Sequence, residues 1–366
     1  MPGDGIGKDV MQAAWLALDA VSIEWEAVPV DVGWDCWCRE GDPLPERSLS
    51  ALRDLKVALF GAITSKPGAE AEAELVPELR GKGLVYRSPI VRLRQEFRLA
   101  VNLRPARALP GNPLNVRDDI DLVVFRENTE DLYAGLEYHP VPDDLRAVLE
   151  RHPRWAPFSD VPADEVALSL RVTTRPACEH ILRAAFEHAR RYGRQRVTVV
   201  EKPNVLRETS GLMVRIAREV AKDYPDLELR EANVDAMAMD LVRAPQDQDV
   251  LVSTNLFGDI LSDLAAQLVG GLGFAASANL GENFALFEPI HGSAPDLAGT
   301  GRANPIGMLQ STVMLLDHLE ERTAARRLEA AVADTVAAGG CRTPDMGGTH
   351  TTMDMATEVA RRIGTL

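Results

Sequence analysis

The stretch DVLVSTNLFGDILSD, residues 249–263, passes directly from an apolar run to helical spacing. The run Asp249–Ser253 predicts a buried strand, and the apolar positions that follow it predict a helix from Asp259 to Val269. A strand that leads straight into a helix is the repeating unit of α/β proteins. The segment therefore predicts an α/β fold with helices packed on a sheet.

The same alternation of strands and helices extends over most of the chain and predicts βαβ units packed in three layers. Helices are predicted at Arg175–Tyr192, with Thr174 and Pro176 at its start and Gly193 at its end, and from Ser210 to Lys222. Further strands are predicted at Val57–Phe60, Leu122–Phe125, Ala167–Val172, Arg196–Val200 and Leu227–Arg230.

Two segments depart from this alternation. Residues 138–164 are rich in Pro, His and charge, and they predict an insertion or arm that is either a solvated connector or an oligomer contact. Residues 3–7, GDGIG, look like the turn after a strand although almost nothing precedes them, so we expect a first strand upstream of residue 1.

The composition is that of an ordinary globular protein, with 46% hydrophobic and 26% charged residues among 366. Asp and Glu number 55 against 40 Lys and Arg, and the formal charge of −15 argues against a general nucleic-acid or anionic-membrane binder. The four cysteines show no disulfide or zinc-site spacing. No signal-peptide core and no apolar run of ~20 residues is present, so we expect a cytoplasmic protein.

Asp259 and Asp263 are four residues apart, so a helix places both carboxylates on one face. Two such carboxylates can hold Mg²⁺ or Mn²⁺ and leave coordination positions for substrate and water. The alternative is that they are acidic residues at a helix start, where the helix dipole favours them. The spacing alone leaves both interpretations open.

Arg94, Arg104 and Arg126 form a second set of candidates, and the last two stand where apolar runs end. Guanidinium groups at strand ends can hold a di- or tricarboxylate by bidentate contacts, although three surface arginines are the simpler alternative. Lys202 directly follows a strand, and Tyr133 is a second possible acid, so both are candidates for proton transfer or for structural roles.

Glycine is concentrated in residues 269–274, and a second candidate loop, HGSAPD, contains Gly292 at residues 291–296. Neither segment is a G-x-G-x-x-G turn after a first strand, and neither is a P-loop. The pattern alone predicts an anion or cofactor loop without naming its ligand.

Together these segments resemble the metal-dependent β-decarboxylating dehydrogenases, the family of isocitrate, homoisocitrate, 3-isopropylmalate and tartrate dehydrogenases. The resemblance is nearest to the isocitrate and homoisocitrate branch and runs in order over nearly the whole chain. It is carried by PGDGIG (2–7), LR (93–94), NLRP (102–105), FRENTEDLYAG (125–135), EKPN (201–204), NLFGDILSD (255–263), HGSAPD (291–296), NP (304–305) and TPDMGGT (343–349).

The resemblance implies an isopropylmalate dehydrogenase-like doubly wound mixed sheet. A large domain would be built from residues 1–99 and 266–366, and a smaller central domain from residues 100–265 with a dimer arm at about 138–170. It also implies a homodimer whose active site lies in the cleft and borrows residues from the partner subunit. The implied substrate is a 2-hydroxy di- or tricarboxylate.

The resemblance carries a role over to each matching residue. Tyr133 and the partner subunit's Lys202 would be the acid–base pair. The substrate would be bound by Ser88, Arg94, Arg104 and Arg126, and the metal by Asp259, Asp263 and Asp235 from the other chain. The cofactor would be bound by Asn204, His291, Gly292, Ser293, Ala294, Pro295, Asp296 and Asn304.

The implied reaction is an oxidative decarboxylation of a 3-substituted (2R)-malate. NAD⁺ would accept a hydride from the carbinol carbon, and Mg²⁺ or Mn²⁺ would stabilise the enolate that forms as CO₂ departs. Lys202 would help to deprotonate the hydroxyl and Tyr133 would protonate the enol carbon. Asp296 indicates NAD⁺ over NADP⁺, because a carboxylate can bond the ribose hydroxyls and repels a 2′-phosphate.

The substrate is expected to be isocitrate or homoisocitrate, on the basis of FRENTE (125–130) and Ser88. The apolar pair Ile90 and Val91 could instead receive an isopropyl group, so 3-isopropylmalate, tartrate or an unusual malate with an anionic substituent near Arg87 are alternatives. A non-catalytic regulatory subunit of a heteromeric isocitrate dehydrogenase is an alternative of another class. The presence of the whole metal and acid–base set favours an enzyme.

Overall fold

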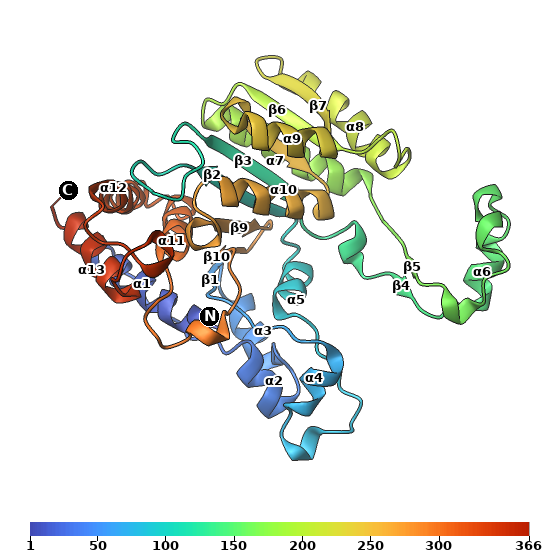
Figure 1. Ribbon diagram of the computed structural model, residues 1–366, viewed down its shortest axis with the longest axis horizontal. Helices are drawn as coiled ribbons and strands as arrows, with labels where there is room; N and C mark the ends of the chain where they lie inside the picture. Colours follow the sequence, from blue (N-terminus) through green and yellow to red (C-terminus); the bar gives the residue numbers. More distant parts are fainter. Residues whose placement is uncertain (366) are drawn as a thin grey trace.

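An eight-stranded mixed sheet runs through the middle of the molecule in the computed structural model, which describes residues 1–365 (Figure 1). The four strands β3, β8, β6 and β7 are parallel, and β1 is parallel to β10, whereas β9 and β2 pair antiparallel with both neighbours. In spatial order the strands are β1 (Val57–Leu59), β10 (Ala285–Pro289), β9 (Ala276–Leu280), β2 (Val101–Arg107), β3 (Asp121–Glu127), β8 (Val250–Ser253), β6 (Arg196–Glu201) and β7 (Glu228–Asn233).

Helices cover both faces of the parallel half of this sheet. Successive residues of a strand point to opposite faces, so Val250 and Val252 of β8 pack with one pair of helices while Leu251 packs with the other. This is why β8 begins with three successive apolar residues rather than alternating apolar and polar ones. The first pair is α7 (Arg175–Arg191) and α8 (Thr209–Val220), and the second is α9 (Val234–Arg243) and α10 (Asn255–Leu268).

Both ends of the chain meet at one end of the sheet, where Figure 1 shows blue α1 beside red α13. The helices here share one buried apolar cluster that includes Leu18, Leu316, Val332 and Val359. They are α1 (Ile6–Ala20), α11 (Ile306–His318), α12 (Arg322–Ala338) and α13 (Thr352–Ile363). The predicted doubly wound arrangement, with both chain ends in one lobe, is thus what the chain adopts.

Four further helices lie around the β1 edge: α2 (Trp34–Glu40), α3 (Glu46–Arg53), α4 (Gly68–Ala73) and α5 (Pro89–Glu96). Ser88 precedes α5 and Pro89 occupies its first turn, where the missing N–H of proline costs nothing. The buried face of α5 carries Leu93 and Arg94. Because α5 leads directly into β2, it places Arg94 near the middle of the sheet.

The segment from β4 (Glu137–Tyr138) through α6 (Asp143–Leu149) to β5 (Leu168–Ser169) extends away from the body (Figure 1). The prediction that Ala167–Val172 is a strand of the layered sheet is wrong, because only Leu168 and Ser169 are in strand and they pair with β4 alone. Side chains here alternate between exposed and half-buried, as expected for a short hairpin without a helix layer over it.

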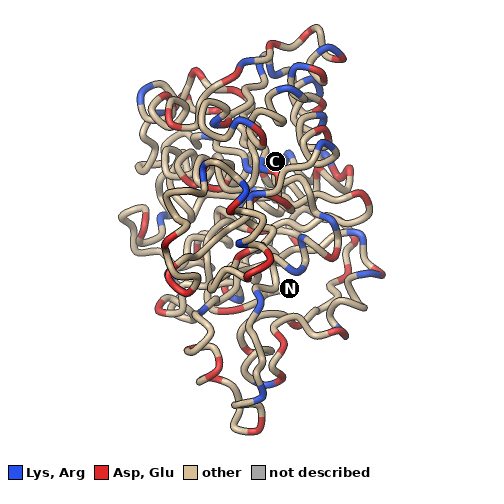
Figure 2. The backbone as a smooth tube through the Cα atoms, turned by 90° about the vertical axis from the view of Figure 1, so that its right-hand side faces the viewer, with Lys and Arg blue, Asp and Glu red and all other residues tan. Residues whose placement is uncertain are grey.

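Lys and Arg are interspersed with Asp and Glu along the backbone, so the negative net charge is spread over many elements (Figure 2). Within residues 1–365, every helix is too short or too polar to cross a bilayer.

Candidate active site

The helix that carries the two candidate metal ligands begins one turn earlier than predicted. α10 starts at Asn255, because Glu201 Oε1 accepts the Thr254 N–H at 3.0 Å and the Asn255 amide donates to the Glu130 carbonyl at 3.2 Å. Asp259 and Asp263 therefore lie beyond the first turn, which holds no acidic residue. The helix dipole acts mainly within the first turn, so it does not explain these two carboxylates.

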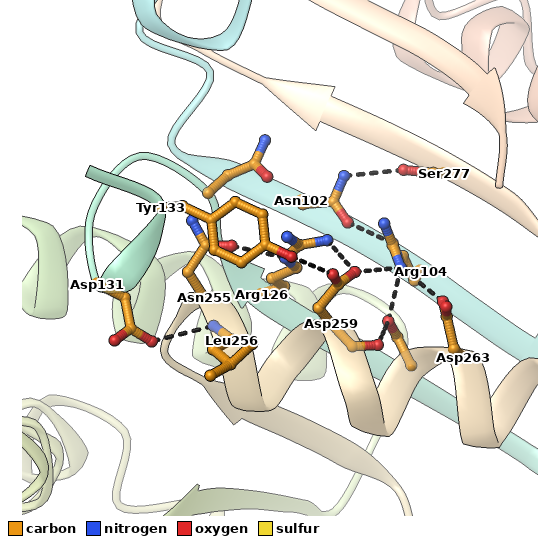
Figure 3. A network of polar contacts seen from close by, with 12 residues as sticks. Asn102, Arg104, Arg126, Asp131, Tyr133, Asn255, Leu256, Asp259, Asp263 and Ser277 are labelled. Carbon is orange, nitrogen blue, oxygen red and sulfur yellow. Dashed lines mark hydrogen bonds and ion pairs between the residues drawn. The ribbon is translucent and has the colours of Figure 1, made fainter. Parts of the chain in front are cut away.

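Arg126, at the end of β3, is almost completely enclosed, with 2% of its side chain exposed. Its Nε donates to Asn255 Oδ1 at 2.8 Å and its Nη1 to Asp259 Oδ1 (Figure 3). The buried Nη2 finds no acceptor among the described residues. A buried guanidinium donor without a partner is costly in a folded protein, so its position suits an anionic ligand.

Arg104 and Arg94 lie beside Arg126. The Nε of Arg104 donates to Asn102 at 2.7 Å, and its Nη1 contacts Ser262 Oγ at 2.8 Å and Asp263 at 3.0 Å (Figure 3). Arg94 is buried, its Nη2 lies 3.5 Å from Glu288, and its Nε lacks an acceptor within residues 1–365.

The three guanidinium groups repel one another. Burial, then the charges of Arg104 and Arg94, lower the pKa of Arg126 to about 10, and burial also lowers the pKa of Arg94. Arg126 remains protonated at neutral pH. Such a cluster, with two buried donors still free, can bind a ligand that carries more than one carboxylate.

Tyr133 lies in the 3₁₀ turn η2 (Leu132–Ala134) and donates its hydroxyl hydrogen to Asp259 Oδ2 at 2.5 Å (Figure 3). Burial and the bond to Asp259 raise the pKa of Tyr133, so the phenol is protonated and can act as an acid. Burial alone would raise the pKa of Asp259, but Arg126, Tyr133 and Arg104 outweigh it and hold that pKa below its usual value. Burial raises the pKa of Asp263.

A single subunit supplies two of the three expected metal ligands. Asp259 and Asp263 share one face of α10, and the side chain of Asp263 is 54% exposed and so open to a ligand. Asp235 stands in the first turn of α9 and pairs with Lys202 instead. Within residues 1–365, no three metal-ligating side chains gather in one place. Two hard oxygen donors fit Mg²⁺ or Mn²⁺, provided that further ligands come from substrate, water or a second copy.

A cavity of about 170 Å³ adjoins the arginine cluster and is lined by both charged and apolar side chains. The charged lining residues are Arg94, Arg104 and Glu288, and the apolar ones include Ile63 and Ile90. His291 and Gly292 also line the cavity, so the candidate cofactor loop begins there. Ser88 lies two residues before Ile90, at the start of α5.

The loop that begins at His291 packs against the N-terminal turn of the chain. The carbonyl of Ser293 accepts the Ile6 N–H at 2.8 Å, and its hydroxyl accepts a bond from Thr64 at 2.8 Å. Gly5 has φ 53°, and a Cβ there would lie 2.0 Å from that carbonyl, so only glycine permits this approach. Burial lowers the pKa of His291, which therefore stays neutral.

The remaining cofactor candidates fall into two groups. Ala294, Pro295 and Asp296 continue the loop, and the buried Asn304 donates to Asp345 at 2.9 Å beside it. Asn204 is exposed after β6, two residues beyond Lys202, and β6 lies toward the opposite end of the sheet from β10. One subunit therefore brings the loop residues together and leaves Asn204 apart from them.

The family model of isocitrate/isopropylmalate dehydrogenases matches residues 1–359. The chain belongs to this family. It is 43% identical over 364 residues to the 3-isopropylmalate dehydrogenase of Methanothermobacter thermautotrophicus, covering 99% of this chain and 97% of that protein. It is 42% identical over 352 residues to the isocitrate/homoisocitrate dehydrogenase of Thermus thermophilus, covering 96% and 93%.

The crystal structure of isocitrate dehydrogenase from Methylococcus capsulatus has the same fold, with a TM-score of 0.86 and 40% identity over 99% of this chain and 98% of that one. The doubly wound isopropylmalate dehydrogenase-like fold is thereby confirmed. As a member of the isocitrate/isopropylmalate dehydrogenase family, the protein is a decarboxylating dehydrogenase that acts on a CH–OH group of a 3-substituted malate.

Several residues of the site were not singled out from the sequence. Asn102 orients Arg104, and Asn255 orients Arg126. Both asparagines lie inside the family motifs, but the motifs did not indicate that these side chains orient the arginines. Glu288 contacts Arg94, which lies 194 residues away in the sequence, and its position near a strand end is the only sequence signal for a role in the site. Residue spacing could not have predicted that Glu288 and Arg94 pair.

Proposed function

We propose that the protein catalyses the NAD⁺-dependent oxidative decarboxylation of a (2R)-malate with an apolar alkyl group at carbon 3. The observation that carries this proposal is the cavity whose lining combines the buried Arg94 and Arg104 with Ile63 and Ile90. The Nε of Arg94 has no acceptor among the described residues. The arginines suit the malate carboxylates, and the isoleucines suit an alkyl substituent. An isopropyl or a methyl group would meet these isoleucines without leaving a polar atom unpaired.

Each side chain has one task in this reaction. Arg94, Arg104 and Arg126 bind and orient the substrate carboxylates. Lys202 accepts the proton of the substrate hydroxyl, and Tyr133 donates its proton to the carbon that loses CO₂. Asp259 and Asp263 are the proposed ligands of Mg²⁺ or Mn²⁺, which would supply Lewis-acid stabilisation of the developing negative charge, and the loop from His291 to Asn304 would hold NAD⁺, which would supply the hydride acceptor.

A homodimer would complete this site, because Lys202 and Asp235 pair with each other rather than with Asp259 in one subunit. α9 and α10 leave apolar side chains uncovered: Met239 is 66% exposed, Val242 65% and Ile260 58%. Burying these residues against a second copy would remove apolar surface from water and would bring the Asp235 pair near Asp259 of the partner. We propose this dimer, in which residues 138–170 form the arm of each subunit. In each subunit, residues 1–99 and 266–366 form the proposed large domain and residues 100–265 the smaller one.

The cofactor assignment rests on the loop from His291 to Asn304. Asp296 lies in the 3₁₀ turn η8 (Pro295–Leu297) of this loop, and its carboxylate is the proposed contact of the adenosine ribose. A carboxylate accepts bonds from ribose hydroxyls and repels a 2′-phosphate, so we propose NAD⁺ rather than NADP⁺.

A second candidate substrate class is isocitrate or homoisocitrate. It is supported by Ser88 at the start of α5, which could bond a third carboxylate. It is disfavoured because the half-buried Ile90, and not Ser88, lines the cavity. Initial rates of NADH release with Mn²⁺ separate the two classes in a panel of 3-isopropylmalate, 3-methylmalate, isocitrate, homoisocitrate, tartrate and malate.

We expect the highest kcat/KM with a 3-alkylmalate. Ile90→Ala should then lower kcat/KM for that substrate by about 10-fold or more and leave malate itself unaffected, because a lost methylene contact in an apolar pocket is worth about 1–3 kcal/mol. A preference for isocitrate or homoisocitrate would contradict the alkyl assignment. Silence of the folded protein across the whole panel would favour a regulatory subunit instead.

A further inference from the structure

Arg171 forms the most highly bonded buried ion cluster that the proposed reaction does not use. Its side chain is 11% exposed, and its Nε donates to Asp131 Oδ1 at 2.5 Å. Its Nη2 donates to Thr254 Oγ1 at 2.5 Å and lies 3.4 Å from Glu201 Oε2. Asp131 is 1% exposed and Glu201 is 0% exposed, so both carboxylates depend on this guanidinium for their positive partner.

The residues that Arg171 joins stand next to the proposed proton-transfer groups and metal ligands. Asp131 lies two residues before Tyr133, and Glu201 directly precedes Lys202. Thr254 precedes α10, which carries Asp259. One planar group therefore connects three segments that are distant in sequence.

The bonds around Asp131 show how closely this junction is held. Asp131 has φ 69°, a left-handed conformation that non-glycine residues rarely adopt, and its N–H donates to the Val172 carbonyl at 2.8 Å. Its second carboxylate oxygen accepts the Leu256 N–H at 3.0 Å, at the start of α10 (Figure 3). The turn that carries Tyr133 is thus bonded to both α10 and the strand-like segment after β5.

Arg171 belongs to the chain that returns from the projecting arm, two residues after β5 (Figure 1). The same guanidinium that meets Asp131 and Glu201 therefore marks the point where the arm joins the body. Its carbon also lies 4.9 Å from the ring centre of Phe257 in α10. A displacement of the arm would therefore disturb the bonds of Arg171 directly, whereas the arginines proposed to bind substrate are not bonded to Arg171.

We propose that Arg171 is a positioning residue that sets the Tyr133 turn and the Lys202 strand end relative to α10, and so links the seating of the arm to both proton-transfer groups. This rests on the proposed function. In the proposed dimer, Tyr133 and Lys202 of one chain serve different active sites. Each Arg171 then connects the two sites of the dimer.

The test compares Arg171→Lys and Arg171→Met with Arg175→Met in the full-length protein. Lysine keeps the charge but has no planar fork, so it cannot bond Asp131, Thr254 and Glu201 together. Arg175 lies in the same segment and forms only an exposed pair with Glu219, which makes its variant a matched control. Circular dichroism and sedimentation verify that each variant is folded and has the oligomeric state of the wild type.

Misplacement of reacting groups by about 1 Å can cost about 100-fold in rate, so we expect kcat to fall by about 10- to 100-fold in Arg171→Lys. The KM for the malate should not change, because the substrate arginines are not bonded to Arg171. The solvent deuterium isotope effect on kcat should rise, since proton transfer becomes slower than the other steps. A merely structural defect would lower the active fraction and leave that isotope effect unchanged.

Hydrogen exchange gives a readout that needs no activity. Residues 129–135 and 202–209 should exchange faster in Arg171→Lys than in the wild type or in Arg175→Met. Should Arg171→Met fail to fold because Asp131 and Glu201 lose their partner, the lysine variant still decides the question. Unchanged exchange in both segments, or a rise in KM with kcat preserved, would overturn the positioning role. A wild type without NADH release would instead refute the proposed function and leave the exchange result to be judged separately.

Discussion

Replacement of Arg126 by lysine tests how the substrate is held. In the wild type, the planar guanidinium of Arg126 bonds Asn255 and Asp259 and keeps Nη2 free for a ligand. The change keeps one positive charge beside Asp259 but removes this planar group. Lysine has three donors at one point and cannot reproduce that geometry. The active site should therefore retain its charge and lose the contact that Nη2 can make with a substrate carboxylate.

The size of the effect follows from the number of bonds lost. A hydrogen bond to a charged group contributes about 1.5–3 kcal/mol, so losing one substrate contact should lower kcat/KM by about 10- to 150-fold. The unpaired Asn255 Oδ1 is buried, and leaving such an acceptor unsatisfied costs about 1–3 kcal/mol of unfolding free energy.

Initial rates of NADH release at saturating NAD⁺ and Mn²⁺ measure the first loss, and urea denaturation measures the second. Arg117→Lys is the matched control, because Arg117 forms a two-point pair with Asp119 on the exposed surface. It should leave both quantities unchanged. A folded Arg126→Lys protein with wild-type kcat/KM would refute the assignment of Arg126 to the substrate carboxylates.

Three further predictions follow from the site and the core. Asp259→Asn should weaken Mn²⁺ binding, measured by electron paramagnetic resonance, and cut turnover by orders of magnitude, whereas near-normal activity would reject the carboxylate site. Asp296→Lys should shift the ratio of kcat/KM values from NAD⁺ toward NADP⁺, and an unchanged ratio counts against the ribose contact. Burial, then Arg194 and Arg191, lower the pKa of His188 to about 4, so between pH 6.5 and 4 the unfolded chain binds a proton that the folded protein does not. The unfolding free energy should fall by about 3 kcal/mol as the pH drops through that window, and His188→Gln should remove this dependence if His188 is its cause.

The sequence was sufficient where a property depends on neighbouring residues. The four-residue spacing of Asp259 and Asp263 determines that they share a helix face, and the apolar run of β8 predicts a strand covered on both sides. The start of α10 was missed because a side chain on another strand, Glu201, bonds the residue before it. Spacing along the chain contains no record of that contact.

The same limit applies to the arm and to the cluster at Arg171. Ala167–Val172 has strand-like alternation, yet whether a strand joins the central sheet depends on which backbone is available beside it. Arg171 meets Asp131 and Glu201 across 40 and 30 residues of chain. Such long-range pairs depend on the assembled fold, so periodicity could not find them.

The central claim is that three arginines and the carboxylates of α10 hold a hydroxy acid and a divalent cation together. A crystal structure of the protein grown with Mn²⁺ and the best substrate of the panel tests it most directly. We predict an ion bound by Asp259, Asp263 and Asp235 of the partner subunit, with the malate carboxylates on Arg94, Arg104 and Arg126. Aspartates turned away from one another with no ion between them, or a substrate bound away from the arginines, would contradict the claim.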